Sequence, residues 1–266
     1  FPYTPQYAKY TKIFKNPLIT NILKLICKFL PNRILPLLGL SYELISLVRH
    51  FPLFMDFVKV PKSIKLICLS NEISEVYKSY GYKNKTFIHK NSAREDLIKF
   101  KEIQSKEKSA ICIGLIQRRK NQFNLSNISC LYFVGPIADK RFKKSHPRYL
   151  GEWTRKELYK KLSNFSSLVL LSEGEAHALV TSEALLAGLG LVLSEEAVAN
   201  LDLSKEFIDV IPNKFKNDIE YIEKVIEKNI YNSIKYRKEI REYGLENFSM
   251  AEVIKSYPPI LKNYYE

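Results

Sequence analysis

The chain has 266 residues, of which 46% are hydrophobic and 12% aromatic, and its 42 Lys and Arg against 28 Asp and Glu give a net charge of +14. This composition excludes a disordered polyelectrolyte, and the length allows one or two domains with a substantial core. The positive charge predicts an anionic partner: a nucleic acid, an anionic lipid or a phosphate-bearing ligand. Residues 1–100 hold 16 of the basic and only 6 of the acidic residues, a net +10.

Residues 1–55 are rich in Leu, Ile, Phe and Lys, and they are divided into short helical or irregular pieces by Pro17, Pro31, Pro36 and Pro52. Residues 17–40 interleave basic and apolar side chains without an acid. Two interpretations stay open: a helix pair packed on a core, or a basic amphipathic surface for anionic lipid headgroups. The second makes residues 9–50 a contact surface for an anionic membrane.

The pattern changes at residue 64. Residues 64–70 form an apolar run that predicts a buried strand, residues 71–81 predict a helix ending at Gly81, and residues 85–89 predict a second strand. The charged stretch 92–109 is expected to hold the connection between domains.

From residue 110 onward, apolar runs alternate with amphipathic segments. We predict strands at 110–116, 130–136, 168–174, 189–194 and 207–212, helices at 154–165 and 177–188, and a mostly helical tail at 215–266. Thr154 with Glu157 three residues later predicts a capping box at the start of the first helix. Continuous apolar strands alternating with helices favour a parallel sheet covered on both faces, whose ligands bind at the carboxyl ends of the strands.

The cysteines support a reducing compartment. Cys68, Cys112 and Cys130 lie inside apolar runs, none of the four cysteines is spaced as C-x-x-C, and all three are expected to be buried thiols. No stretch reaches the ~18 uncharged apolar residues of a membrane-spanning helix. We therefore expect a cytoplasmic protein, with membrane association on the cytoplasmic face if residues 9–50 contact lipid.

A cluster of basic side chains follows the strand 110–116. Arg118, Arg119 and Lys120 come four to six residues after Gly114, where backbone amides and cations could neutralise a diphosphate. The alternative is a solvated basic loop.

Two glutamates mark the next strand end. Glu175 and Glu183 are separated by seven residues, and the helix expected from His177 would offer its amino-terminal N–H groups to an anion. Glu183 lies in an Ala- and Leu-rich stretch, where a carboxylate needs a partner such as a sugar hydroxyl. Simpler roles remain open, namely a capping box of Glu175 with Ser172 and an exposed position for Glu183.

These residues carry a family resemblance. The stretch SEGEAHALVTSEALLAGL resembles the E-x7-E region of retaining family-4 glycosyltransferases, with Glu175 and Glu183 on its two glutamates. The stretch ICIGLIQRRKNQ is similar to the family's V-G-R-L-x-x-x-K-N loop, and the segments LYFVGP, YLGEWTRKELYKKLSNFSSLVLLS and KLICLSNEISEVYKSYGYKNKTFIHKNS match in order, with Asn91 on the Asn of a P-N-G turn. The resemblance covers residues ~64–212 and rests on this order of segments.

The resemblance implies an α/β, GT-B-like fold: two Rossmann-like domains facing each other across a cleft, the amino-terminal one short or truncated. The expected domains are 1–105 on the acceptor side, 106–235 for the nucleotide sugar, and 236–266 as terminal helices packing back on the first. It also implies Glu175 and Lys120 as catalytic residues. The implied donor-binding residues are Gly114, Arg118, Arg119, Lys120, His177, Ala178, Leu179, Val180 and Glu183.

The chain departs from the family pattern at several positions. Leu115 stands where the family has a phosphate-binding Arg, which Arg118 or Arg119 would replace, and His177 stands at a family Phe. His50 is the nearest match to the family's cleft-lining His, although a structural role suits it better. The glycine-rich turn that opens the family's first domain is missing, since Gly39 is the one glycine before Gly81.

The resemblance implies transfer of a sugar from a UDP- or GDP-sugar to a glycan or lipid-linked acceptor, with retention of configuration and no cofactor. No D-x-D motif is present, so no catalytic metal is predicted. Three alternatives remain: an enzyme of the same architecture with another reaction, such as a sugar-nucleotide epimerase or a phosphorylase, a non-catalytic nucleotide-binding remnant, and a nucleic-acid binder. The last lacks any recognised nucleic-acid motif, so we expect no nucleic-acid partner.

Overall fold

The computed structural model describes residue 22 and residues 64–79, 82–101 and 108–265. The chain divides into two compact units, Phe1–Ile88 and His89–Glu266. The expected domains 1–105, 106–235 and 236–266 stay a prediction. Residues 9–50, expected to contact lipid, lie outside the described residues apart from residue 22, and so do His50 and Cys27. Searched over the described ranges, no helix has both the length and the hydrophobicity needed to cross a membrane.

The described part of the first unit is a small β-α-β element. Strands β1 (Leu66–Cys68) and β2 (Thr86–Ile88) pair in parallel, and α6 (Asn71–Ser79) connects them. The Ser74 and Thr86 hydroxyls, 2.6 Å apart, join the helix to β2. All three elements lie within the strands and helix predicted from the sequence.

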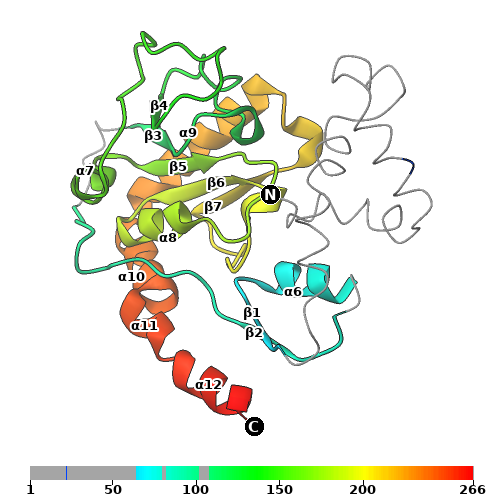
Figure 1. The fold of residues 1–266 in the computed structure, drawn as a ribbon. Helices are drawn as coiled ribbons and strands as arrows, with labels where there is room; N and C mark the ends of the chain where they lie inside the picture. The colour runs from blue at the N-terminus through cyan, green and yellow to red at the C-terminus, as the bar shows by residue number, and fades with distance from the viewer. Residues whose placement is uncertain (1–21, 23–63, 80–81, 102–107, 266) are drawn as a thin grey trace. The chain divides into compact units, whose positions relative to one another are not determined.

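The second unit is built on a five-stranded parallel sheet. Its strands are β3 (Ala110–Ile113), β4 (Leu131–Val134), β5 (Ser167–Leu170), β6 (Gly190–Ser194) and β7 (Ile208–Ile211), in the order β4-β3-β5-β6-β7 (Figure 1). Each observed strand overlaps a predicted one. The prediction of an α/β fold with parallel sheets is confirmed.

A short extended segment continues the sheet beyond β4. The backbone of residues 148–151 forms a parallel ladder with β4, because Leu150 N donates to Phe133 O at 2.9 Å and Gly135 N donates to Gly151 O at 3.0 Å. Counting this segment, the order becomes 3-2-1-4-5-6, which is that of a doubly wound nucleotide-binding sheet. The connections 114–130 and 135–148 on either side of β4 consist of turns and one 3-10 helix, where such sheets more often use α-helices.

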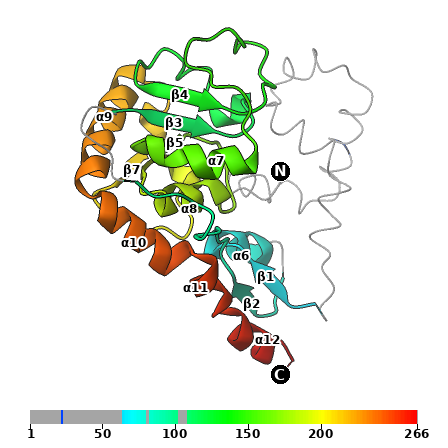
Figure 2. The ribbon, with the colours of Figure 1, turned by 90° about the vertical axis from the view of Figure 1, so that its left-hand side faces the viewer.

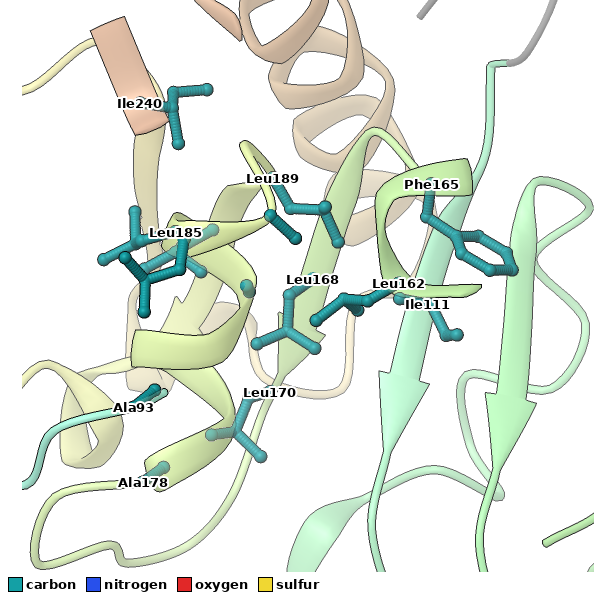
Figure 3. Close-up of a cluster of buried hydrophobic side chains, with 14 of the residues drawn as sticks. Ala93, Ile111, Leu162, Phe165, Leu168, Leu170, Ala178, Leu185, Leu189 and Ile240 are labelled. Atoms are coloured by element: carbon teal, nitrogen blue, oxygen red, sulfur yellow. The ribbon is translucent and has the colours of Figure 1, made fainter. Parts of the chain in front are cut away.

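Alternating side chains of the strands build two cores on opposite faces of the sheet. One face packs against α7 (Arg155–Lys161), α8 (Leu179–Leu186) and α10 (Arg237–Phe248), and its buried residues from the strands and loops include Ile111, Leu168 and Leu170 (Figure 3). The other face packs against α9 (Ile219–Lys235), as Figure 2 shows. This helix contributes Ile222 and Ile226 to the core on that face. Helices on both faces explain why the strands read as unbroken apolar runs.

Local signals place the helices of the second unit. The capping box predicted at Thr154 is formed: its hydroxyl accepts from Glu157 N at 3.2 Å, and the Glu157 carboxylate accepts from Thr154 N at 3.0 Å. The tail is helical as predicted and continues through α11 (Met250–Ile254) and α12 (Tyr257–Tyr265). The helix predicted from His177 begins two residues later, at Leu179, so Glu183 lies about one turn into it.

Cysteines of the described chain carry free thiols, as predicted. Cys68 and Cys112 are buried, whereas Cys130 is only half-buried. Burial raises the pKa of Cys130 to about 11 and that of Cys112 further, so both stay protonated at neutral pH.

Candidate functional site

Two glycines shape the turns that leave β3 and β4. Gly114 and Gly135 have φ of 126° and 130°, a region that L side chains rarely adopt. A Cβ on Gly135 would overlap the backbone of Gly114, and one on Gly114 would lie 3.1 Å from Lys120 Nζ. The turn after β3 therefore brings the ammonium group of Lys120 close to the chain at the carboxyl end of the strand.

The three cations of the basic loop form a 3-10 helix, Arg118–Lys120, directly after that turn. Arg119 ties this helix to the loop after β5: its guanidinium donates to Ser172 Oγ at 3.0 Å and to Gly174 O, and its own carbonyl accepts from Glu173 N at 2.8 Å. The loop is thus a structured connection between two strand ends, and it is not merely solvated.

Glu175 faces two cations without being fully bonded. Its Oε1 lies 3.5 Å from Arg119 Nη1 and 3.6 Å from Lys120 Nζ. That oxygen is buried and has no hydrogen-bond partner among the described residues. A buried carboxylate oxygen in this condition retains the capacity to accept hydrogen bonds from a ligand. Ser172 bonds Arg119 and Gly174, so the capping box of Glu175 with Ser172 is not what the structure shows.

The amino terminus of α8 follows Glu175 directly. Ala178 is the N-cap residue with extended backbone, and it offers no side-chain cap to the first turn. Leu179 and Val180 open the helix, and their N–H groups belong to the end that carries partial positive charge. This terminus and the cations of the 3-10 helix both follow carboxyl ends of strands, where such sheets bind ligands.

Glu183 is buried, at 2% exposure, and it has partners that the sequence did not reveal. It pairs with Arg155 of α7 and accepts a hydrogen bond from Tyr159. Burial raises the pKa of the Glu183 carboxyl, an effect that the Arg155 cation and the two hydrogen bonds oppose. The alternative of an exposed Glu183 is wrong, because the inner turns of α8 pack into the core.

His177 is likewise buried, at 5% exposure, and bonds to a distant segment. Its Nδ1 accepts from Asn91 N at 2.9 Å, and its carbonyl accepts from Asn91 Nδ2 at 2.8 Å. Burial, assisted by the nearby Lys90 charge, lowers the pKa of the imidazole to about 4. The ring is therefore neutral at physiological pH, with its proton on Nε2.

The structure brings some of the expected site residues together and separates others. Gly114, Arg119, Lys120 and Glu175 form one cluster. Glu175 N donates to Glu196 O at 3.2 Å, which joins the cluster to the 3-10 helix Glu195–Ala197 that follows β6. Arg118 is exposed. The pKa of Asp139 is lowered mainly by its hydrogen bonds with Arg141, and the Arg118 charge contributes to the same lowering.

Three residues hold this region through contacts that the sequence did not predict: Ser172 with Arg119, Arg155 with Glu183, and Asn91 with His177. For Arg155 the sequence held one signal: the capping box at Thr154 places Arg155 at the amino terminus of a helix. No local pattern indicates the contacts that Ser172 and Asn91 make, because their partners lie 53 and 86 residues away in the sequence.

Known proteins were compared with the chain. No family model and no curated protein matches it. Among solved structures, it is similar to sucrose-phosphate synthase from Thermosynechococcus elongatus, with a TM-score of 0.62 and 14% identity over 76% of this chain and 58% of that one. A structure of Anabaena HepE in complex with UDP-glucose gives a TM-score of 0.58 and 9% identity over 74% of this chain and 63% of that one.

WaaG, a glycosyltransferase involved in lipopolysaccharide biosynthesis, is similar with a TM-score of 0.62 and 16% identity over 81% of this chain and 68% of that one. The chain has the GT-B fold. The fold class predicted from the sequence is confirmed, and at these identities the similarity concerns the fold alone. The chain spans about three fifths of the length of sucrose-phosphate synthase and HepE.

Proposed function

We propose that the chain is a glycosyltransferase that takes a sugar from a nucleoside-diphosphate sugar and transfers it with retention of configuration. The observation that carries the proposal is the cluster at the carboxyl ends of β3 and β5. There, the buried Glu175 Oε1 lacks a hydrogen-bond partner among the described residues and lies 3.6 Å from Lys120 Nζ, next to the uncapped start of α8.

This arrangement suits the leaving of a diphosphate. Lys120 and the amides of Ala178–Val180 would stabilise the negative charge that develops as the bond between sugar and diphosphate breaks. Arg119 holds the loop after β5 in place and adds positive charge, while the exposed Arg118 would be free to approach the diphosphate. Glu175 would accept hydrogen bonds from hydroxyl groups of the sugar and hold its anomeric carbon beside the diphosphate.

For Glu183 we propose contact with the ribose hydroxyls of the nucleotide. Arg155 and Tyr159 are the hydrogen-bond partners of this carboxylate, so the ribose would compete with Arg155 for it. Arg155 is suited to such an exchange because its side chain is 57% exposed. The donor is proposed to be a UDP- or GDP-hexose, and the HepE complex with UDP-glucose supports the uridine choice.

The acceptor is proposed to be a glycan or lipid-linked glycan at the cytoplasmic face of a membrane. The basic residues 9–50 provide the charge for that surface.

Donor hydrolysis tests the proposal without knowledge of the acceptor. The purified chain is incubated with UDP-glucose, UDP-N-acetylglucosamine and GDP-mannose, and the anomer of the released sugar is read by proton NMR before mutarotation. We expect one donor to release its sugar with retained configuration, and Glu175→Gln and Lys120→Met to reduce the rate by about 10²-fold. Nucleotide binding without release from any donor would instead indicate a non-catalytic remnant.

A further inference from the structure

Residues 89–93 pass beside the amino terminus of α8. Ala93 N donates to Phe248 O at 2.9 Å, and Met250 N donates to Ala93 O at 3.0 Å, so this segment is anchored at the junction of α10 and α11. Lys90 lies over the Phe248 ring, with Nζ 4.8 Å from its centroid. Between these anchors, Asn91 points to His177.

Asn91 donates two hydrogen bonds to His177. Its backbone N–H donates to Nδ1 of the ring, and its side-chain amide donates to the main-chain carbonyl of the same residue. One bond sets the rotation of the ring and the other sets the position of the peptide. Together they leave residue 177 little freedom, because the ring is also packed against Phe248, 5.7 Å away between centroids.

His177 joins the two parts of the candidate site. Glu175 lies two residues before it, and Ala178, the N-cap of α8, follows it directly. The Nε2 atom of the ring is buried and has no hydrogen-bond partner among the described residues, so of the two ring nitrogens Nδ1 is the one seen to be bonded. If the bond from Asn91 to Nδ1 is lost, no other hydrogen bond of the ring seen among the described residues remains to hold His177 in place.

We infer that Asn91 is a positioning residue of the donor site, which holds the loop 175–178 so that Glu175 and the first amides of α8 face the bound nucleotide sugar together. The inference rests on the proposed function, since it assigns a role within that site. Asn91 itself acts through His177 and needs no contact with the donor. An error of about 1 Å in such a loop is enough to impair a preorganised site.

Four variants test the inference. Asn91→Ala removes the side-chain bond, and Asn91→Asp retains the size but presents an acceptor to the His177 carbonyl. His177→Leu removes the ring acceptor, whereas His177→Asn is the matched control because its Oδ1 can take the place of Nδ1. Fluorescence of Trp153, the one tryptophan of the chain, establishes that each variant remains folded.

Two measurements are made on each variant. Hydrogen exchange monitors the amides of residues 175–180 against those of β3 and β5, and calorimetry gives the dissociation constants of UDP and GDP. For Asn91→Ala, Asn91→Asp and His177→Leu we expect faster exchange confined to 175–180 and at least about tenfold weaker binding of the diphosphate that binds the wild type. His177→Asn should remain close to wild type in the exchange of residues 175–180.

Exchange and binding as in the wild type for Asn91→Ala would overturn the inference, and so would equal effects of His177→Leu and His177→Asn on the exchange of residues 175–180. If the wild type binds neither UDP nor GDP, the proposed function fails. The exchange of residues 175–180 still decides whether Asn91 positions this loop.

Discussion

Acidification should destabilise the second unit through His177. In the folded chain burial lowers the pKa of this imidazole from 6.5 to about 4, whereas the unfolded chain retains the ordinary value. The unfolded state therefore binds more protons between these two values, and stability falls as the pH falls below about 6.5. The stabilising contribution is fully present above that pH.

The size of the effect follows from the same two values. At pH 5 almost all unfolded chains would carry a protonated imidazole, whereas only about a tenth of the folded ones would. The difference amounts to about 2 kcal/mol of unfolding free energy lost between pH 7.5 and pH 5. This is a large part of the stability of an ordinary domain.

Urea denaturation followed by Trp153 fluorescence measures this loss, since Trp153 packs against the core of the second unit. His177→Asn serves as the control because it cannot titrate, while His89 and His146 remain in both proteins and cancel in the difference. We expect the wild type to lose about 2 kcal/mol more than His177→Asn between pH 7.5 and pH 5. Parallel pH profiles would show that His177 charges in the folded state, and would refute the assignment of Nδ1 as an acceptor.

Three further predictions concern stability, each measured by urea denaturation. Gly135→Ala should lower the free energy of unfolding by about 3 kcal/mol or more, because its Cβ would overlap the Gly114 backbone at positive φ. Gly151→Ala, at φ 81° with open space around it, should lower it by only about 1 kcal/mol. Equal losses would contradict the close approach of the two turns. Arg155→Met should leave Glu183 buried without its cation and cost about 1–3 kcal/mol at pH 7.5. Because the pKa of Glu183 is raised, this carboxyl begins to bind a proton as the pH falls, and a protonated Glu183 no longer needs the Arg155 cation. The unfolding free energy lost in Arg155→Met should therefore become smaller toward pH 5, and a loss that does not vary with pH would argue against the pair. Thr154→Ala should cost about 1 kcal/mol by loss of the capping box, and an unchanged stability would show that the cap does not support α7.

The hydrophobic pattern was enough to predict the strands of both units. Runs such as 110–116 and 189–194 are apolar at every position because both faces of the sheet are covered, and this leaves little ambiguity. The sequence does not predict residues 148–151 as part of the sheet, because the segment is short and polar residues flank it, so that it forms no apolar run. Its place depends on the β4 backbone, which the sequence does not reveal.

The candidate site could be predicted in part for the same reason. Chain order alone places Lys120 and Glu175 at one edge of a parallel sheet, and the structure puts them 3.6 Å apart in side-chain contact. The bonds of Asn91 to His177 and of Arg155 to Glu183 depend on tertiary packing between segments 86 and 28 residues apart, and no local period encodes them.

The cluster of Lys120, Glu175 and the start of α8 is proposed to bind a nucleoside diphosphate. Calorimetric titration of the full chain with UDP, GDP and ADP tests it most directly, with Lys120→Met measured alongside the wild type. We predict that UDP or GDP binds the wild type and that Lys120→Met weakens this binding by at least about tenfold. Binding of neither UDP nor GDP, or equal binding to both proteins, would contradict the assignment.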